Sequence, residues 1–279
     1  MSVVIRSAVD FYNRHPITAD IVLAKLRQAR GHLDDLQPEE LLAHDQDHYG
    51  GTGATDALAK LAHITQATKV ADFCAGIGGP ARYLAHRYGA DVTGIELTPA
   101  RVAGANALTR RVGLQDRVRV IEGDVMQVPL PDASVDAVIS QEALLHVPDN
   151  LRALREAHRI LKPGGRIAFS TWIAPRPLSE PDRDLMWRGM AMASLHSLEG
   201  YQALLSEAGF TVTAAEDLTA EWGEILRERL AMYRKLRGEA EAAGTPSGHD
   251  AFYDSYVRFV DLATSGDMGG GRFAATKAT

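Results

Sequence analysis

The sequence predicts an α/β fold with one seven-stranded, mostly parallel sheet and helices on both of its faces. Three observations carry this prediction. Strand-like and helix-like segments alternate from residue 69 onward, a glycine-rich turn follows the first strand, and no polar linker separates the flanking segments from the sheet. A chain of 279 residues can form one large domain or two small ones, and the unbroken pattern favours one.

Seven short apolar segments are the expected strands: residues 69–74, 91–96, 117–122, 134–140, 166–172, 210–215 and 272–275. Helices are expected over residues 80–88, from residue 98 to near residue 113, and over residues 150–161 and 197–208. Pro80 and Pro99 lie in the first turns of two of these helices, and glycines follow the ends of three, as is usual for both residue types. A turn at residues 162–165 precedes the fifth strand.

The segments that flank this centre are expected to be mainly helical. Residues 1–66 contain no strand candidate and are predicted to form a helical N-terminal cover of the active site, before a core domain of residues 67–279. Residues 173–200 follow the fifth strand and contain Met186, Trp187, Met190 and Met192. These side chains are most simply core residues; as a hypothesis, the segment is instead a helical lid on the substrate pocket. A C-terminal helical insertion is expected at about 217–265, with a basic amphipathic helix near 224–243 and a loop at 244–250.

The composition is that of a folded, water-soluble enzyme or binding protein. Hydrophobic residues make up 46% and charged residues 24% of the chain, which excludes a disordered or collagen-like chain. No apolar run reaches the ~18–20 residues that span a bilayer, and the N-terminus lacks a signal-peptide pattern. Because the single cysteine cannot form an internal disulfide, we expect a cytoplasmic protein. The net charge of −6 argues against binding to nucleic acid or membrane, and a homodimer is compatible with the sequence.

Residues 76–81 satisfy the pattern G-x-G-x-x-A, which alone suggests a nicotinamide or flavin dinucleotide site. Three carboxylates at successive strand ends point elsewhere. Asp72 lies four residues before Gly76, Glu96 lies 20 residues after it, and Asp124 follows the third strand. A carboxylate disfavours the pyrophosphate of a dinucleotide but favours the ammonium and sulfonium of S-adenosylmethionine. Each one alone could be a capping, surface or turn residue, but three at neighbouring strand ends indicate a ligand site.

Four stretches resemble the class I S-adenosylmethionine-dependent methyltransferases in order and spacing, over about residues 45–215: VADFCAGIGG, GIELTPA, EGDVMQVPLPDASVDAVIS and LKPGGRIAFS. The resemblance implies a Rossmann-like sheet with S-adenosyl-L-methionine as the cofactor and S-adenosyl-L-homocysteine as the product. Cys74 departs from the pattern, because the family usually has glycine at that position.

The resemblance also implies a role for each cofactor residue. Glu96 would hold the ribose, Asp124 would accept from the adenine amino group, and the adenine would lie between Leu97 and Val125. The methionine part would be surrounded by Asp72, Ala75, Gly76 and Gly78. The remaining residues assigned to the cofactor are Tyr49, Gly51, Arg101 and Gln141.

The segment SQEALLH, which ends at His146, resembles the sarcosine/dimethylglycine and phosphoethanolamine N-methyltransferase group. Residues 45–51 resemble the segment that closes over the cofactor in that group. His146 is the candidate catalytic base, because imidazole changes charge near neutral pH, and Tyr49 is its expected partner. The alternative is that His146 binds a backbone group at a helix start. Tyr49 could equally be a lid residue that packs on the methionine part of the cofactor. The expected substrate contacts are Gln141, His146, Trp172 and Trp187.

Several functions remain open at this stage. An amine acceptor is slightly favoured, O- or C-methylation in natural-product biosynthesis suits the same motifs, and a methyltransferase-fold protein could bind the cofactor without methylating. A nicotinamide oxidoreductase rests on the glycine spacing alone. His44 and His48 have a metal-like spacing, but the sequence offers no matching ligand cluster, so no metal is expected.

Overall fold

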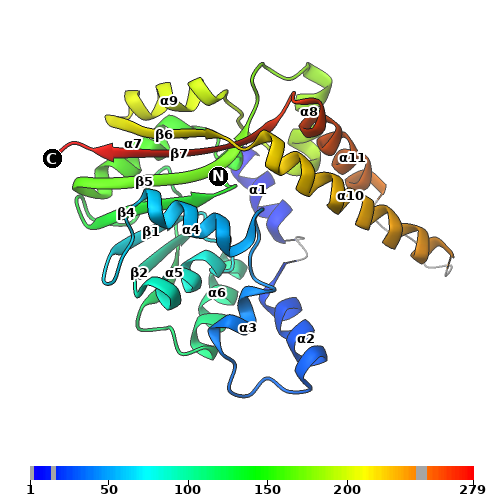
Figure 1. Cartoon of the computed structure of the whole chain (residues 1–279), viewed down its shortest axis with the longest axis horizontal. Helices are drawn as coiled ribbons and strands as arrows, with labels where there is room; N and C mark the ends of the chain where they lie inside the picture. The colour runs from blue at the N-terminus through cyan, green and yellow to red at the C-terminus, as the bar shows by residue number, and fades with distance from the viewer. Residues whose placement is uncertain (1–2, 14–16, 243–249) are drawn as a thin grey trace.

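The computed structural model describes residues 3–13, 17–242 and 250–279 (Figure 1). Its sheet has the strand order β3-β2-β1-β4-β5-β7-β6, and β7 runs antiparallel to both of its neighbours while the other pairs are parallel. The strands are β1 (Lys69–Phe73), β2 (Asp91–Glu96), β3 (Val118–Glu122), β4 (Val135–Gln141), β5 (Leu161–Ile173), β6 (Phe210–Asp217) and β7 (Gly269–Lys277). The predicted seven-stranded, mostly parallel sheet is confirmed.

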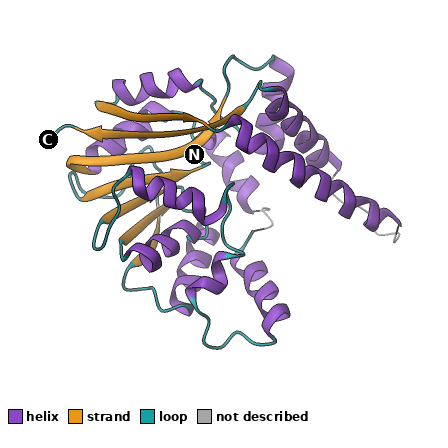
Figure 2. Ribbon diagram, in the orientation of Figure 1, coloured by secondary structure: helices purple, strands orange, loops and turns teal. Residues whose placement is uncertain are grey.

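Helices cover both faces of this sheet (Figure 2). The first four are α1 (Val3–Asn13), α2 (Ala19–Arg30), α3 (Pro38–Leu42) and α4 (Gly51–Leu61), all before the first strand. Those between strands are α5 (Gly79–Tyr88), α6 (Pro99–Arg111), the 3₁₀ helix η1 (Leu144–His146), α7 (Asn150–Ile160), α8 (Glu180–Met190), α9 (Leu198–Glu207), α10 (Thr219–Ala242) and α11 (Asp250–Ser265). In Figure 1, α10 and α11 lie side by side and extend away from the sheet.

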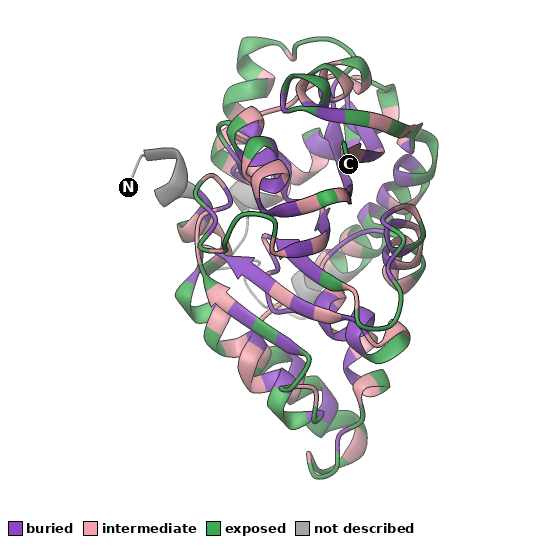
Figure 3. Ribbon diagram, turned by 90° about the vertical axis from the view of Figure 1, so that its left-hand side faces the viewer, coloured by how far each residue is buried: buried purple, intermediate pink, exposed green. Residues whose placement is uncertain are grey.

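Two apolar cores lie on opposite faces of the sheet, and Figure 3 shows burial concentrated along the strands. One core packs Leu154 of α7 and Tyr201 of α9 against strand residues such as Phe73. The other packs Leu58 of α4 and Leu84 of α5 against the opposite face. A third apolar cluster, which includes Trp172 and Trp222, joins β5 to α8, α10 and α11. No helix of the described residues is long and apolar enough to cross a membrane.

The sheet differs from the predicted one at its C-terminal strand, which has nine residues instead of four. The extra residues are Thr276, Lys277 and the glycines 269–271, and a run of three glycines is typical of a turn. The glycines pair with β5, and a Cβ atom on Gly270 would lie 2.4 Å from the ring of Trp222. Glycine is required here because aromatic side chains cover the strand, a tertiary reason that the local pattern does not reveal.

Of three smaller predictions, the structure corrects two and leaves the third untested. Residues 162–165, predicted as a turn, lie within β5 in the structure. Helix α10 begins at Thr219, five residues before the predicted start at 224. The loop predicted at 244–250 lies outside the described residues except for its last position, which begins α11.

A buried ion pair attaches the N-terminal segment to the sheet domain. Arg82 of α5 and Asp45 have only 1% of their surface exposed. The Arg82 guanidinium donates through Nε (3.2 Å) and Nη2 (2.8 Å) to Asp45 Oδ2, and through Nη1 to the carbonyl of Ala105 and the hydroxyl of Thr109. A Cβ atom on Gly79 would lie 2.2 Å from the Asp45 carbonyl oxygen, so the backbones approach closely. Residue 45 is therefore held against α5 and α6.

Replacing Arg82 with methionine is expected to lower the free energy of unfolding by about 3–5 kcal/mol, because it leaves the Asp45 carboxylate buried without its partner. Urea denaturation followed by circular dichroism measures this loss. Arg87→Met, on the exposed side of the same helix, is the matched control and should change stability by less than about 0.5 kcal/mol. Equal stabilities of the two variants would contradict the assignment.

Candidate cofactor-binding site

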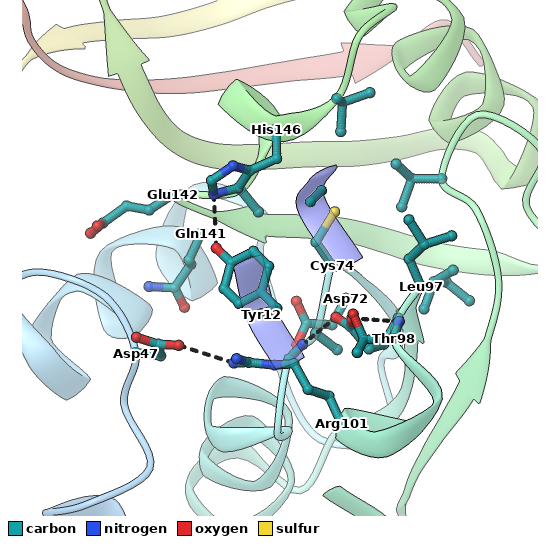
Figure 4. Close-up of a pocket in the computed structure, with 18 of the residues that line it drawn as sticks. Tyr12, Asp47, Asp72, Cys74, Leu97, Thr98, Arg101, Gln141, Glu142 and His146 are labelled. Atoms are coloured by element: carbon teal, nitrogen blue, oxygen red, sulfur yellow. Dashed lines mark hydrogen bonds and ion pairs between the residues drawn. The ribbon is translucent and has the colours of Figure 1, made fainter. Parts of the chain in front are cut away.

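The candidate site is a cavity at the carboxyl ends of β1, β2 and β4. The strand order reverses direction between β1 and β4, and open α/β sheets bind ligands at such a switch point. Residues from α1, from the segment before α4 and from the loops after all four parallel strands β1–β4 line it. Figure 4 shows several of these side chains pointing into one space.

The glycine-rich turn after β1 forms the floor of the cavity. Gly76 and Gly78 have φ angles of +57° and +78°, a region that glycine adopts without strain. A Cβ atom on Gly76 would lie 2.8 Å from Nη2 of Arg101. Ala75 and Gly76 line the cavity, whereas Gly78 begins α5 as its N-cap outside the lining.

Cys74 also has a left-handed backbone, with φ of +59°. A non-glycine residue in this region costs roughly 1–2 kcal/mol, which agrees with the glycine that the family resemblance implies at this position. Burial, with the nearby Glu96 and Asp72 carboxylates, raises the pKa of the Cys74 thiol well above its ordinary value. The thiol is therefore protonated at neutral pH, which argues against a nucleophilic role.

Asp72 is the least satisfied acidic group of the site. It is 2% exposed, and its Oδ2 atom has no hydrogen-bond partner among the described residues. Burial, and secondly the charge of Glu96, raise the pKa of Asp72 to about 8. A cationic group placed beside Oδ2 would compensate this cost, because a buried carboxylate needs a partner of opposite charge. The orphaned atom thus fits the ammonium of S-adenosylmethionine.

Glu96 is held at the end of β2 by two backbone amides. Oε2 accepts from Gly76 N and Oε1 accepts from Thr98 N, both at 2.9 Å. Each carboxylate oxygen has a second lone pair, so the side chain can accept further hydrogen bonds from ribose hydroxyls. These contacts fix the distance between the glycine turn and the end of β2.

The remaining predicted cofactor residues divide into two groups. Leu97, Asp124, Val125 and Gln141 line the cavity. The Oδ1 atom of Asp124 accepts from Met126 N at 2.8 Å, which orients the carboxylate at the end of β3. Gly51, at the start of α4, lies outside the lining.

Arg101 connects the cavity to two residues that the sequence did not indicate. Its Nη2 atom donates to Asp47 at 3.0 Å, and its guanidinium lies 4.6 Å from the centroid of the Tyr12 ring. Its Nε and Nη1 atoms have no hydrogen-bond partner among the described residues. Tyr12 comes from α1, far from any recognisable motif, and only the amphipathic character of that helix could have suggested that one of its faces is buried.

His146 lies at the opposite end of the cavity with defined partners on both ring nitrogens. Nδ1 lies 3.0 Å from the carbonyl oxygen of Ala191, which can only accept, so Nδ1 carries the proton. In the neutral ring Nε2 is then an acceptor, and it lies 2.8 Å from the hydroxyl of Tyr12. Figure 4 shows Tyr12 between His146 and Arg101. The structure therefore pairs His146 with Tyr12, not with Tyr49.

Tyr49 packs in the third apolar cluster instead of lining the cavity. Its ring centroid lies 5.8 Å from that of Trp172 and 5.5 Å from that of Trp222, and the Arg229 guanidinium lies 4.4 Å from it. Trp172 is 3% exposed and also lies outside the cavity lining. Trp187, on α8, is likewise not part of this lining. The expected substrate contacts of both tryptophans are therefore not formed by this cavity.

Glu142 is the acidic residue that the sequence reasoning missed. It follows β4 with φ of +53°, lines the cavity, and accepts from the backbone N–H of Tyr49. Burial raises the pKa of its carboxyl to about 8. The neighbouring Gln141 accepts from the Thr55 hydroxyl at 3.0 Å, and its Nε2 lies 3.2 Å from Nδ1 of His48. An isolated strained φ is invisible in the sequence, so the signal available was the position of Glu142 directly after a predicted strand.

Comparison with known sequences identifies the domain. The family described as "Methyltransferase domain" matches residues 71–169, which contain most of β1, all of β2 to β4 and most of the cavity floor. Residues 71–169 therefore form a methyltransferase domain, as the resemblance to the class I S-adenosylmethionine-dependent enzymes implied. The resemblance expected from the sequence is thereby confirmed.

Three known proteins illustrate what the methyltransferase domain is similar to. The 27-O-demethylrifamycin SV methyltransferase of Amycolatopsis mediterranei is 36% identical over 171 residues, 60% of this chain and 63% of that protein. Phosphoethanolamine N-methyltransferase 1 of Zea mays is 27% identical over 82% of this chain and 45% of that protein. The chain therefore spans about half to two thirds of these relatives. The structure of Haemonchus contortus phosphoethanolamine N-methyltransferase 2 shares the fold, with a TM-score of 0.76 and 21% identity over 97% of this chain and 60% of that chain.

The raised pKa of Asp72 predicts how cofactor binding depends on pH. In the empty methyltransferase domain Asp72 is mostly protonated below pH 8, and a cationic ligand binds the ionised form. Binding of S-adenosylmethionine at pH 7 should release about one proton, and the affinity should rise up to about tenfold per pH unit toward pH 8. Calorimetry in buffers of different ionisation enthalpy measures both effects.

Asp72→Asn should remove the proton release and flatten the pH profile, because the amide cannot ionise. The matched control is Asp116→Asn, at an exposed position away from the cavity, which should behave as the unsubstituted chain. A proton release that persists in Asp72→Asn would assign the effect to another group and contradict this interpretation.

Proposed function

We propose that this chain transfers the methyl group of S-adenosyl-L-methionine to a small-molecule acceptor by in-line displacement. The observation that carries the proposal is the unpartnered, buried Asp72 carboxyl, in one cavity with Glu96 and Asp124, at three strand ends of a methyltransferase domain. When bound there, the cofactor supplies an electrophilic methyl group on a sulfonium. The cavity residues align the two reactants and exclude water, which accounts for much of the catalysis expected in such a transfer.

The proposed cofactor contacts follow from the positions of the polar groups. Asp72 binds the ammonium, Arg101 offers its two unpartnered nitrogen atoms to the carboxylate of the methionine part, and Glu96 accepts from the ribose. Asp124 orients the adenine from the end of β3, with Leu97 and Val125 on its faces. The Gly76 turn leaves room for this ligand, because a side chain there would meet Arg101.

The acceptor end of the proposed site is the Tyr12–His146 pair. An acceptor N–H or O–H beside the Tyr12 hydroxyl can lose its proton to Tyr12, while the Tyr12 proton moves to Nε2 of His146. The Ala191 carbonyl keeps Nδ1 protonated and would stabilise the resulting imidazolium. Burial raises the pKa of Tyr12 above the ordinary value, so Tyr12 is a neutral phenol and can accept a proton only while its own proton passes to the imidazole.

An amine acceptor suits the charge of the cavity better than a neutral oxygen or carbon acceptor. Asp47 and Glu142 line the cavity together with the cofactor carboxylates. The Asp47 carboxylate would attract a protonated amine, and the amine's charge would favour the ionised form of Glu142. The named activities of the relatives include both O- and N-methyl transfer. We also propose that residues 1–66 form a helical cover of the active site, supported by Tyr12, and that residues 67–279 form the core with its lid and C-terminal insertion.

A transfer assay with labelled S-adenosylmethionine across small amines, phenols and carbon acids tests the acceptor class. Labelled product is expected with amines, and the label should appear at least about tenfold more slowly in Glu96→Ala. Loss of a hydrogen-bonded buried charge costs about 1.5–3 kcal/mol of cofactor binding. Cofactor binding without transfer to any of the acceptors would contradict the catalytic proposal and leave the binding proposal intact.

Replacing His146 with alanine is expected to lower kcat by about 10²–10⁴-fold, the usual contribution of a positioned acid–base group. Tyr12→Phe should lower kcat in the same range, because it removes the hydroxyl that reaches His146. Cofactor affinity, measured by calorimetry with S-adenosylhomocysteine, should change less than about twofold in His146→Ala. His32→Ala, at an exposed position, is the control. An unchanged kcat in His146→Ala would remove this residue from the mechanism.

A further inference from the structure

A second cavity lies on the other side of η1, between the segment after β5 and helix α8. Its volume is about 380 Å³. Its lining consists of residues 174–178, Arg183, Met186, residues 192–195 and Ser197. The volume is in the range of small-molecule sites. Neither the methyl-transfer proposal nor the cofactor contacts use any of these residues.

The wall between the two cavities is a short segment bound to η1. The N–H groups of Ala193 and Ser194 donate to the Leu145 carbonyl at 2.7 and 3.0 Å, and the Ser194 hydroxyl donates to the Val147 carbonyl at 2.8 Å. Met186 and Met192 pack with Leu145 in the third apolar cluster. The second cavity is therefore separated from the cofactor cavity by hydrogen-bonded backbone and packed side chains.

The charge of the second cavity is opposite to that of the first. Its described lining contains two arginines, Arg176 and Arg183, and no aspartate or glutamate. The cofactor cavity is lined by six acidic residues, Asp45, Asp47, Asp72, Glu96, Asp124 and Glu142, with Arg101 as its arginine. In a chain with a net charge of −6, a cavity with this lining is a local positive site.

The two arginines are available to a ligand. The carboxylates beside Arg183 in the sequence are already paired, Asp182 with Arg258 and Asp184 with Arg188. Arg176 lies 3.6 Å from Asp267, and their side chains are 84% and 46% exposed. An exposed ion pair at this distance contributes little, so an anion in the cavity can replace it at low cost.

Apart from Ser194 and Ser197, the rest of the lining is apolar. Leu178, Met186, Met192 and Leu195 supply aliphatic and thioether groups, and Pro175 and Pro177 add rigid apolar surface. Methionine side chains adapt to ligands of irregular shape. The apolar part of a ligand would bury its surface against these residues. The acidic group of the same ligand would pair with an arginine, because a guanidinium binds carboxylates and phosphates through a planar pair of donors.

We propose that this second cavity binds an amphiphilic anion, a small molecule with an apolar body and one carboxylate, phosphate or sulfonate group. The apolar body lies against Met186 and Met192, and the anionic group lies between Arg176 and Arg183. The proposal is independent of methyl transfer, because it rests on the lining of a separate cavity.

The test uses two matched fluorescent probes, 8-anilinonaphthalene-1-sulfonate and the uncharged N-phenyl-1-naphthylamine, titrated onto the full chain. The double variant Arg176→Gln/Arg183→Gln should weaken binding of the sulfonate probe at least tenfold and change binding of the uncharged probe less than twofold. Arg111→Gln, at an exposed position at the end of α6 and outside the cavity lining, is the control and should leave both affinities unchanged. Equal sulfonate affinity in the double variant and the control overturns the proposal.

A crystal structure with the sulfonate probe locates the bound molecule. Density between Arg176 and Arg183 supports the proposal, and density confined to the cofactor cavity overturns it. Competition with decanoate and with decyl phosphate then distinguishes a carboxylate from a phosphate ligand. Displacement of the probe by either compound supports an amphiphilic anion, whereas displacement by neither overturns it.

Discussion

The architecture of the cofactor cavity depends on the buried pair of Arg82 and Asp45. Neither charge could remain in the interior without the other, so residue 45 has one place, against α5 and α6. The chain that follows is thereby positioned along the cavity. Asp47 reaches Arg101, His48 reaches Gln141, and the N–H of residue 49 reaches the carboxylate after β4. One desolvated interaction thus sets several contacts around the proposed cofactor.

Two of the seven described non-glycine residues with a positive φ lie at the two strand ends that border the switch point. Cys74 after β1 and Glu142 after β4 both have left-handed backbones although neither is glycine. Such residues persist where the surrounding structure determines their conformation, which is common at functional sites. Here Glu142 is held by the N–H of Tyr49, and the turn after Cys74 is held by Glu96 through Gly76. The strain is offset by the contacts that shape the site.

The parts of the site that the sequence predicted are those encoded locally. The glycine turn, Asp72, Glu96 and Asp124 all lie within a few residues of a recognisable strand end, and the structure gathers them in one cavity. The partner of His146 could not be found this way, because Tyr12 is 134 residues away and in contact only through the tertiary fold. The position of Trp172 relative to the cavity could not be judged from the sequence for a related reason. A strand covered by helices is apolar on both faces, so alternation does not indicate which face meets the ligand. The glycines of β7 could not be predicted as strand residues either, because the side chains that require glycine there reach the strand only in the folded protein.

The electrostatics of the two cavities follow from how each is closed. Burial raises the pKa of Asp72 to about 8, so the cofactor cavity holds a carboxyl group that a cationic cofactor beside Oδ2 would ionise. The second cavity is lined by two exposed arginines, and Arg176 forms only a long, exposed ion pair with Asp267. A cationic ligand therefore stabilises the cofactor cavity by neutralising its acidic groups. The second cavity attracts an anionic ligand but does not need one for stability. The wall of residues 191–194 separates these environments and also supplies the Ala191 carbonyl that fixes the tautomer of His146.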